Sequence, residues 1–294
     1  MPSAFAIPAL FVAGVLAILP PSAAVGAPAR DRFFTTSDGV RLHYLQAGPA
    51  NPAARTIVLV PGWTMPAWIW ERQLADLSAQ FRVIAFDPRS QGDSQIAPSG
   101  HEPGRRGADI GELIAQLGPG KILLVGWSLG VLDSLAYIHT AGDAHLAGLV
   151  LVDNSIGEDP PPAPPKPHPP GPKLTWAQDM RRFVATMFAR PQSKSYLDRL
   201  TAACLRTPEP IAKALLAYPV PRSYWKAAVY SVHAPVLYIV RPKFAGQADN
   251  LAAHHPNAES VVLPKLGHAL FVDDPVRFDR MLRDFVARRV WPKA

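Results

Sequence analysis

Cysteine is almost absent from this chain of 294 residues, whose only cysteine is Cys204. One cysteine excludes an internal disulfide and any metal site built on several cysteines. Nothing around Cys204 resembles a nucleophile motif, so we interpret it as a buried or partly buried spectator. The chain also lacks an H-E-x-x-H motif, and the adjacent His254 and His255 would diverge by about 100° on a helix. The sequence therefore predicts neither a bound metal nor a cofactor.

Long runs of like charge are missing, although the chain is basic overall, with a formal net charge of +7. A basic surface attracts anions over long distances, but nucleic-acid binding is usually marked by dense basic clusters or a recognisable motif. Basic residues here form only pairs such as Arg105-Arg106, without zinc-finger spacing or an RNA-binding signature. We expect a small-molecule substrate and no nucleic-acid partner, and the sequence leaves the oligomeric state open.

Charged side chains are absent from residues 1–29, and long apolar runs are absent from the rest of the chain. The apolar run 4–19 is too short for a comfortable bilayer span, and small residues follow it up to Ala27. This pattern predicts a signal peptide over residues 1–27 and an exported protein, periplasmic or secreted. After its removal we expect no membrane span. The alternative is an uncleaved N-terminus that anchors the chain in the membrane.

Short apolar runs alternate with helical stretches from residue 30 onward. Runs that are apolar on both faces are typical of parallel strands covered by helices. Alternation of the two predicts βαβ units, and therefore an α/β fold with a doubly wound, mostly parallel sheet. The expected strands are 41–46, 56–60, 82–86, 121–125, 149–152, 236–240 and 260–263. The expected helices are 70–80, 107–117, 129–140 and 275–290.

Two neighbouring regions break this alternation. Residues 160–172 contain nine prolines, which exclude a helix or a central strand and favour an extended polyproline segment. Residues 175–228 are helical in pattern and rich in aromatic residues and methionine. We therefore predict a core in two parts, 30–155 and 231–294, separated by a proline-rich tether and a small helical cap over 156–230.

A G-x-S-x-G motif, Gly126-Trp127-Ser128-Leu129-Gly130, stands directly between an expected strand and an expected helix. In that context the tight turn exposes a serine above the sheet edge, which makes Ser128 the candidate nucleophile. The N–H of Leu129 lies at a helix N-terminus, where it can stabilise an oxyanion. The loop after strand 56–60 contains Pro61-Gly62-Trp63, and the N–H of Trp63 is our candidate for the second oxyanion donor.

The candidate base is His268. It follows Gly267 on a loop between the last expected strand and the last expected helix, and it continues into an apolar stretch. From that loop an imidazole can reach Ser128 and accept its proton.

Together these segments resemble the α/β-hydrolase superfamily. The resemblance rests on PGW at 61–63, FDPRSQGDS at 86–94, GWSLG at 126–130 and GHALFVDDP at 267–275, and it covers about residues 33–155 and 230–290. It is nearest to the branch of esterases, haloperoxidase-like enzymes, haloalkane dehalogenases and epoxide hydrolases. The resemblance implies the roles given above for Ser128, His268, Trp63 and Leu129. A serine nucleophile argues against dehalogenase and epoxide hydrolase activity, because those relatives use an aspartate there.

The triad acid departs from the common pattern of the family. Many relatives carry an aspartate after the strand equivalent to 236–240, but this chain has Arg241-Pro242-Lys243 there. The next carboxylate is Asp249, which we expect to begin a helix. Other relatives carry the acid after the preceding strand, where this chain has Asp153. We favour Asp153 and keep Asp249 as the alternative acid, with the possibility open that neither serves.

The remaining aspartates near the motifs have simpler interpretations. We expect Asp87 to fix its loop together with Arg89 and Ser90. We expect Asp273 and Asp274 to cap the start of the final helix, where a carboxylate favours the helix dipole.

Three functions fit these residues. The first is a serine hydrolase, specifically a carboxylic ester hydrolase that forms an acyl-enzyme through a Ser-His-Asp triad. Tryptophans near the motifs and the absence of a basic cluster favour an apolar or aromatic substrate over a phosphorylated or highly charged one. The second is a ligand-binding protein without catalysis, motivated by the missing acid after strand 236–240. The third is a cofactor-free perhydrolase or haloperoxidase-type enzyme.

Overall fold

The computed structural model describes residues 28–292 apart from 52, 165–170 and 172. The predicted signal peptide, 1–27, and part of the predicted polyproline segment therefore lie outside the described residues. Among the helices that are described, none has both the length and the apolar character needed to span a bilayer.

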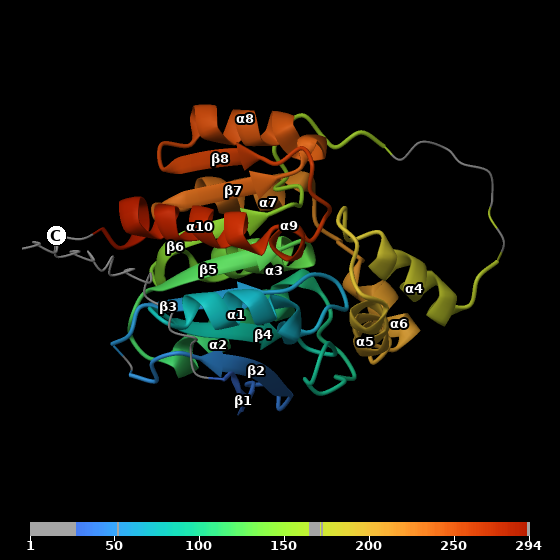
Figure 1. The fold of residues 1–294 in the computed structure, drawn as a ribbon. Helices are drawn as coiled ribbons and strands as arrows, with labels where there is room; N and C mark the ends of the chain where they lie inside the picture. Colours follow the sequence, from blue (N-terminus) through green and yellow to red (C-terminus); the bar gives the residue numbers. More distant parts are fainter. Residues whose placement is uncertain (1–27, 52, 165–170, 172, 293–294) are drawn as a thin grey trace, which may run out of the picture.

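Eight strands of the described residues form one sheet, in the order β1-β2-β4-β3-β5-β6-β7-β8 (Figure 1). Strands β3 to β8 run parallel, and β1 and β2 are added antiparallel at one edge. Parallel neighbours share their carboxyl-terminal edge, so the loops that leave these strands gather at one end of the sheet. The strands are β1 (Arg30–Thr35), β2 (Arg41–Ala47), β3 (Thr56–Val60), β4 (Arg82–Asp87), β5 (Ile122–Trp127), β6 (Leu146–Val152), β7 (Val236–Val240) and β8 (Ala258–Val262).

Helices cover both faces of the sheet, as the doubly buried strands predict. Helices α2, α3, α7 and α8 pack on one face, and η1, α1, α9 and α10 pack on the other. The helices of the core are η1 (Ala67–Trp70), α1 (Glu71–Leu77), α2 (Pro103–Leu117), α3 (Leu129–Ala141), α7 (Arg222–Tyr230), η2 (Pro242–Phe244), α8 (Ala245–His254), α9 (Leu270–Asp273), α10 (Pro275–Phe285) and the π-helical turn η3 (Val286–Val290).

The expected α/β fold is confirmed, and differences are confined to particular elements. β1 was missed because it is an exposed edge strand without an apolar run. α2 begins four residues earlier than predicted, at Pro103, a residue that favours the first turn of a helix. α8 begins at Ala245, so Asp249 lies inside this helix and the expectation that it starts the helix was wrong. Cys204 is buried, and burial raises the pKa of its thiol to about 12.

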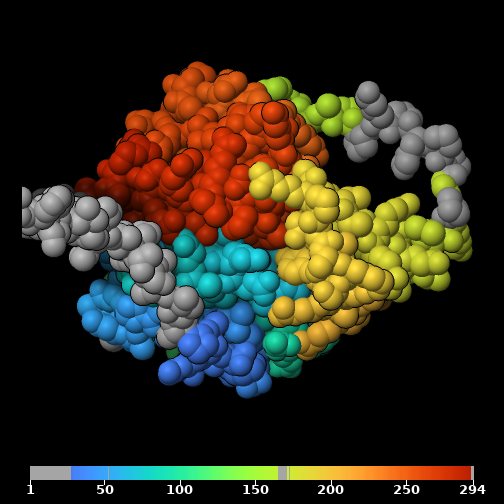
Figure 2. Space-filling model, in the orientation of Figure 1, coloured from blue at the N-terminus to red at the C-terminus, as the bar shows by residue number. Residues whose placement is uncertain are grey.

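Three helices stand off the sheet between β6 and β7, at the end where the parallel strands terminate (Figure 1). They are α4 (Trp176–Ala185), α5 (Lys194–Cys204) and α6 (Glu209–Leu215), and we call them the cap. Figure 2 shows this yellow segment packed against the core. The next helix, α7, was assigned to the cap from sequence, but it packs on α3 in the core through Trp225 and Val229.

Asp279 on α10 is a buried carboxylate that joins α10 to α1. It accepts a hydrogen bond from Nε2 of Gln73 at 2.9 Å, and only 3% of its surface is exposed. Burial raises its pKa to about 6, above the ordinary value, because the ionised form loses its hydration. Between about pH 4 and about pH 6 the folded state therefore holds a proton that the unfolded state has released, so stability falls as pH rises through this window.

We predict that Asp279→Asn raises the free energy of unfolding by about 1–2 kcal/mol at pH 8, with the gain shrinking toward zero near pH 4. The asparagine resembles the protonated acid, and its amide can donate to Oε1 of Gln73, which has no partner among the described residues. Urea unfolding at the two pH values measures the effect. Asp284→Asn, an exposed change on the same helix, is the control. A loss of stability in Asp279→Asn at pH 8 would contradict the prediction.

Candidate active site

Ser128 occupies a strained turn between β5 and α3. Its backbone has φ 55° and ψ −119°, a left-handed conformation that side chains rarely adopt. The strain persists because both sides of the turn are held. The N–H of Ser128 donates to the carbonyl of Val152 at 2.9 Å, and Asn154 donates from Nδ2 to the carbonyl of Ser128 at 2.8 Å. The turn presents the serine at the carboxyl-terminal edge of the sheet.

The two glycines of the motif allow this turn to pack tightly. A Cβ atom on Gly126 would lie 2.4 Å from the carbonyl oxygen of Gly130, and one on Gly130 would lie 2.5 Å from the carbonyl oxygen of Val60. Both distances are far inside van der Waals contact, so any side chain would displace backbone. The spacing of the motif is therefore a packing requirement of the turn.

Ser128, His268 and Asp153 are brought together from three separate loops. Nε2 of His268 lies 2.8 Å from Oγ of Ser128, and Nδ1 lies 2.5 Å from Oδ2 of Asp153. Asp153 directly follows β6, the neighbour of β5, and the loop of His268 follows β8. His268 and Ser128 are partly exposed, whereas Asp153 is fully buried.

The state of Asp153 fixes the tautomer of His268. Burial alone raises the pKa of this carboxyl, but the hydrogen bond from His268 and the charges of His268 and Arg241 outweigh burial and lower the pKa below its ordinary value. An ionised carboxylate can only accept, so Nδ1 of His268 must carry the hydrogen. Nε2 is then free to accept a proton from Ser128.

Arg241 is the residue at this site that sequence reasoning missed. Its backbone N–H donates to Oδ1 of Asp153 at 2.9 Å, and its Nε donates to Oδ2 at 2.6 Å. Its Nη2 also lies 3.3 Å from Nδ1 of His268. Nη2 of Arg241 and Nδ1 of His268 are both donors, so they do not bond to each other. They lie close together because both side chains contact the carboxylate of Asp153. Arg241 reaches Asp153 because β6 and β7 are neighbours in the sheet, so the residues that follow them share an edge.

The alternative acid, Asp249, is not part of this arrangement. It is exposed on α8 and does not line the cavity around Ser128 and His268. Nδ1 of His268 already contacts Asp153, so the expectation that Asp249 could serve as the acid is not supported by the geometry.

Of the two expected oxyanion donors, Leu129 directly follows Ser128, and Trp63 follows a glycine that approaches Ser128 from another loop. Leu129 is the first residue of α3, and the first N–H groups of a helix have no partner within it. Trp63 lies in the loop after β3, where Gly62 closely approaches Ser128: a Cβ on Gly62 would be 3.0 Å from that of the serine. The indole of Trp63 donates to the carbonyl of Ala212 at 2.6 Å, which ties this loop to α6 of the cap.

One cavity lies under the cap, and a second beside it contains the candidate nucleophile, base and acid, with Thr186 in the lining of both. The first, which we call the apolar cavity, has a volume of about 410 Å³ and is lined by Trp63, Trp176, Asp179, Met180, Arg182, Phe183 and Thr186. The second, the basic cavity, has a volume of about 440 Å³ and is lined by Ser128, Asp153, Asn154, Thr186, Met187, Arg241, Lys243, Phe244 and His268. The expectation that no basic cluster faces the site was therefore wrong, because Arg241 and Lys243 follow β7 to the same edge.

The tryptophans near the motifs divide between cavity and core. Trp63 lines the apolar cavity and makes edge-to-face contacts with Trp176 and Phe183. Trp70 and Trp127 are buried in the core, where both pack on Phe271.

Asp273 holds the loop of His268 and does not act as a helix cap. Its carboxylate accepts from the N–H of Gly267 at 2.6 Å and from the N–H of Ala189 at 2.8 Å. The N–H of Ala269 donates in turn to the carbonyl of Met187 at 2.9 Å. The segment after α4 is thereby joined to the histidine loop. Asp274 does cap α10, as expected, through the N–H of Arg277.

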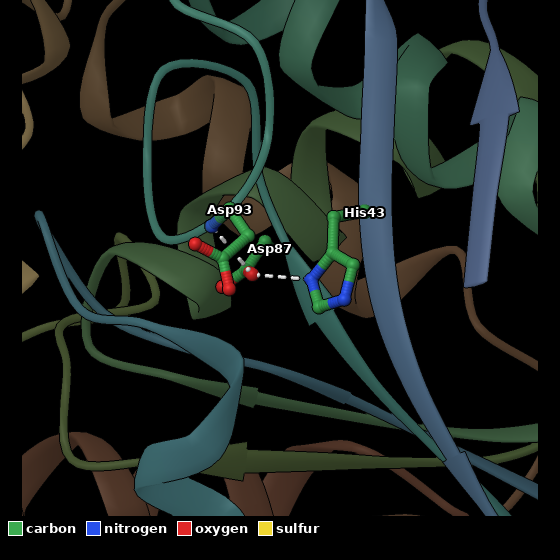
Figure 3. A group of neighbouring side chains, drawn as sticks. All are labelled: His43, Asp87 and Asp93. Atoms are coloured by element: carbon green, nitrogen blue, oxygen red, sulfur yellow. Dashed lines mark hydrogen bonds and ion pairs between the residues drawn. The ribbon is translucent and has the colours of Figure 1, made fainter. Parts of the chain in front are cut away.

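His43, Asp87 and Asp93 form the one group of three or more potential metal ligands found in the described residues (Figure 3). Asp87 lies between the other two and bonds Nδ1 of His43 at 2.6 Å and the N–H of Asp93 at 2.8 Å, while its second oxygen accepts from the N–H of Ala67. Burial alone lowers the pKa of His43, but the bond to Asp87 raises it overall. These bonds account for the group as a network that fixes the loop after β4.

The expected partners of Asp87 were incorrect in detail. Arg89 pairs instead with Asp109 through two hydrogen bonds of 2.6 and 2.7 Å, and Ser90 contacts His101.

The fold and the strained turn at Ser128 point to a protein family, and a comparison with family models tests it. The model of the Alpha/beta hydrolase family matches residues 57–280. The chain belongs to the alpha/beta hydrolase family. This assignment confirms the resemblance stated from the motifs, and the homologous proteins include hydrolases and haloperoxidases.

Curated relatives match about two fifths of the chain. A soluble epoxide hydrolase from Corynebacterium sp. (strain C12) is 34% identical over 138 residues, which are 40% of this chain and 47% of that protein. A non-heme chloroperoxidase from Streptomyces lividans is 34% identical over 119 residues, 40% of this chain and 42% of that protein. The matched regions thus span less than half of either relative.

Solved structures match the chain over most of its length. A candidate aryl esterase from Burkholderia cenocepacia superposes with a TM-score of 0.75 at 26% identity, covering 87% of this chain and 98% of that one. The esterase RhEst1 from Rhodococcus sp. ECU1013 superposes with a TM-score of 0.73 at 23% identity, covering 88% and 99%. The second likeness shows the fold alone.

We predict that Gly130→Ala lowers the free energy of unfolding by about 1–3 kcal/mol, because its methyl group would meet the carbonyl of Val60 in the turn. Gly104→Ala is the matched control, since Gly104 lies in α2 with open space around its Cβ position. That change should stabilise the protein by about 0.5–1 kcal/mol. Urea unfolding of both variants measures the difference. Equal stability of the two would contradict the prediction, because it would show that the turn accommodates a methyl group at Gly130.

Proposed function

We propose that this protein is a serine hydrolase that cleaves carboxylic esters through an acyl-enzyme, with Ser128 as nucleophile, His268 as base and Asp153 as acid. The observation that carries the proposal is the continuous contact from Oγ of Ser128 through the imidazole to the carboxylate, at 2.8 and 2.5 Å. This geometry is what a weak hydroxyl nucleophile needs in order to lose its proton as it attacks.

In the proposed reaction, Oγ of Ser128 attacks the ester carbonyl while Nε2 of His268 takes the hydroxyl proton. The negative charge that develops on the carbonyl oxygen is stabilised by the N–H groups of Trp63 and Leu129. His268 then gives its proton to the departing alkoxide or phenoxide. The acyl group stays on Oγ of Ser128 as an ester. In the second half of the reaction, water attacks the acyl carbon while His268 takes its proton. His268 then returns the proton to Oγ of Ser128, which releases the acid and restores the serine. Asp153 stabilises the imidazolium formed in each half.

The apolar cavity supports an apolar or aromatic group on the substrate. Trp63, Trp176 and Phe183 offer ring faces and edges there, and Met180 adds an adaptable apolar surface. The likeness to a candidate aryl esterase agrees with this proposal without naming a substrate.

A binding protein without catalysis is the weaker alternative. It was motivated by the missing acid after β7, and the contact between Asp153 and His268 removes that motivation. A perhydrolase or haloperoxidase-type activity stays a second candidate, because non-heme haloperoxidases are among the similar proteins. In that reaction hydrogen peroxide replaces water in the second half, and a peracid is released.

We predict that a fluorophosphonate probe labels the wild-type protein and fails to label Ser128→Ala. Asp153→Asn should slow both labelling and the hydrolysis of phenyl acetate by about 10²- to 10⁴-fold, because the imidazole loses the group that fixes its tautomer. Asp249→Asn, the same change on an exposed helix, should stay within about twofold of wild type. Far-ultraviolet circular dichroism verifies that each variant is folded.

Two outcomes would contradict the proposal. If folded wild-type protein neither reacts with the probe nor hydrolyses phenyl acetate, the result favours a binding protein without catalysis. If Asp153→Asn keeps full reactivity, the acid lies elsewhere.

The second candidate is separated by peroxide. Hydrogen peroxide with acetate and bromide should give little bromination of monochlorodimedone relative to the rate of ester hydrolysis, if water is the natural acceptor. Bromination that exceeds hydrolysis and vanishes in Ser128→Ala would establish the perhydrolase instead.

A further inference from the structure

We propose that the substrate carries a carboxylate in addition to its ester group, and that the basic cavity binds this carboxylate through Lys243. The proposal rests on the ester hydrolase function given above and names the class of its substrate: esters with an aromatic group on one side of the ester bond and an anionic group on the other.

The charges around the basic cavity leave one cation without an anionic partner among the described residues. Arg241 is paired with the buried Asp153 at 2.6 Å, so these two charges offset one another. Lys243 is exposed, and its ammonium lies 5.2 Å from the centre of the Phe244 ring without an ion pair to any described carboxylate. His268 is neutral in the state that accepts the serine proton. The cavity that contains the nucleophile therefore has a net charge of one positive unit in the described residues that line it.

The apolar cavity is balanced in contrast. Its two charged residues, Asp179 and Arg182, pair with each other at 3.0 Å, and its remaining lining is aromatic, apolar or hydroxylic. An anionic group therefore finds no net charge attraction in this cavity, whereas an aromatic ring finds favourable contacts with other rings.

The two cavities are neighbours, because Thr186 lines both. A substrate whose ester bond lies at Ser128 would extend into the apolar cavity on one side and toward Lys243 on the other. A single uncompensated lysine suits a monoanion such as a carboxylate. A phosphate dianion would leave one charge unmatched beside the buried carboxylate of Asp153.

Two pairs of esters test the proposal, one for each orientation of the ester bond. The first pair is monophenyl adipate and phenyl 6-oxoheptanoate, in which a methyl ketone replaces the carboxylate. The second pair is the benzoate ester of 6-hydroxyhexanoic acid and the benzoate ester of 7-hydroxyheptan-2-one. We expect kcat/KM to favour the anionic member of at least one pair by about fivefold, the strength of an exposed ion pair, with the preference shrinking in 0.5 M NaCl.

Variants locate the preference. Lys243→Met keeps most of the apolar stem and removes the charge, so it should reduce the ratio of anionic to neutral kcat/KM toward one. Lys121→Met is the matched control, because Lys121 is exposed just before β5, at the opposite end of the sheet from Ser128. It should leave the ratio unchanged. The ratio isolates charge recognition from any general loss of activity in a variant.

The results separate this proposal from the proposed function. Equal kcat/KM for both members of both pairs, or an equal loss of preference in Lys121→Met, overturns the carboxylate site while leaving the hydrolase intact. If Ser128 reacts with fluorophosphonate but no ester is cleaved, the slowing of labelling by each ester measures the same preference. If the protein neither labels nor hydrolyses any ester, the hydrolase proposal fails, and the carboxylate site fails with it.

Discussion

Asp153 is fully buried, and the free-energy cost of burying its charge explains how the carboxyl-terminal edge of the sheet is arranged. An ionised carboxylate removed from water must be surrounded by donors or opposite charge. Here the donors come from two other loops: the backbone and guanidinium of Arg241 after β7, and the imidazole of His268 after β8. One buried charge thereby fixes the mutual positions of three loops, and the imidazole that it orients reaches Ser128.

The same edge contains four residues other than glycine with left-handed backbone. Thr64, Ser90, Ser128 and Asp153 each lie in the loop after a different parallel strand. Each such conformation costs about 1–3 kcal/mol, and it persists only where surrounding contacts hold it. Thr64, for example, is held by a hydrogen bond from its N–H to Gln91, and Ser128 by Val152 and Asn154. The regular sheet beneath supplies the rigidity that keeps these turns in place.

Sequence reasoning reached the fold and part of the site because both depend on local patterns. The doubly apolar strands predicted the parallel sheet, and the strand-turn-helix context of Ser128 predicted the strained turn. What it missed depends on partners distant in sequence. Lys243 and Arg241 reach the cavity only because β7 lies beside β6, and the carboxylate of Asp273 accepts from Ala189 in the distant segment after α4. The packing of α7 on the core likewise follows from tertiary contacts that its pattern does not reveal.

The bond network of Asp273 has a consequence for how the family could diversify. If cap and core were independent modules, one cap could replace another without changing the structure of the core. Here the stretch after α4 supplies Met187 to a cavity wall, while its backbone at Met187 and Ala189 holds the loop of His268 in place. A grafted cap from another enzyme would have to reproduce this short stretch, or the imported specificity would arrive with a misplaced histidine.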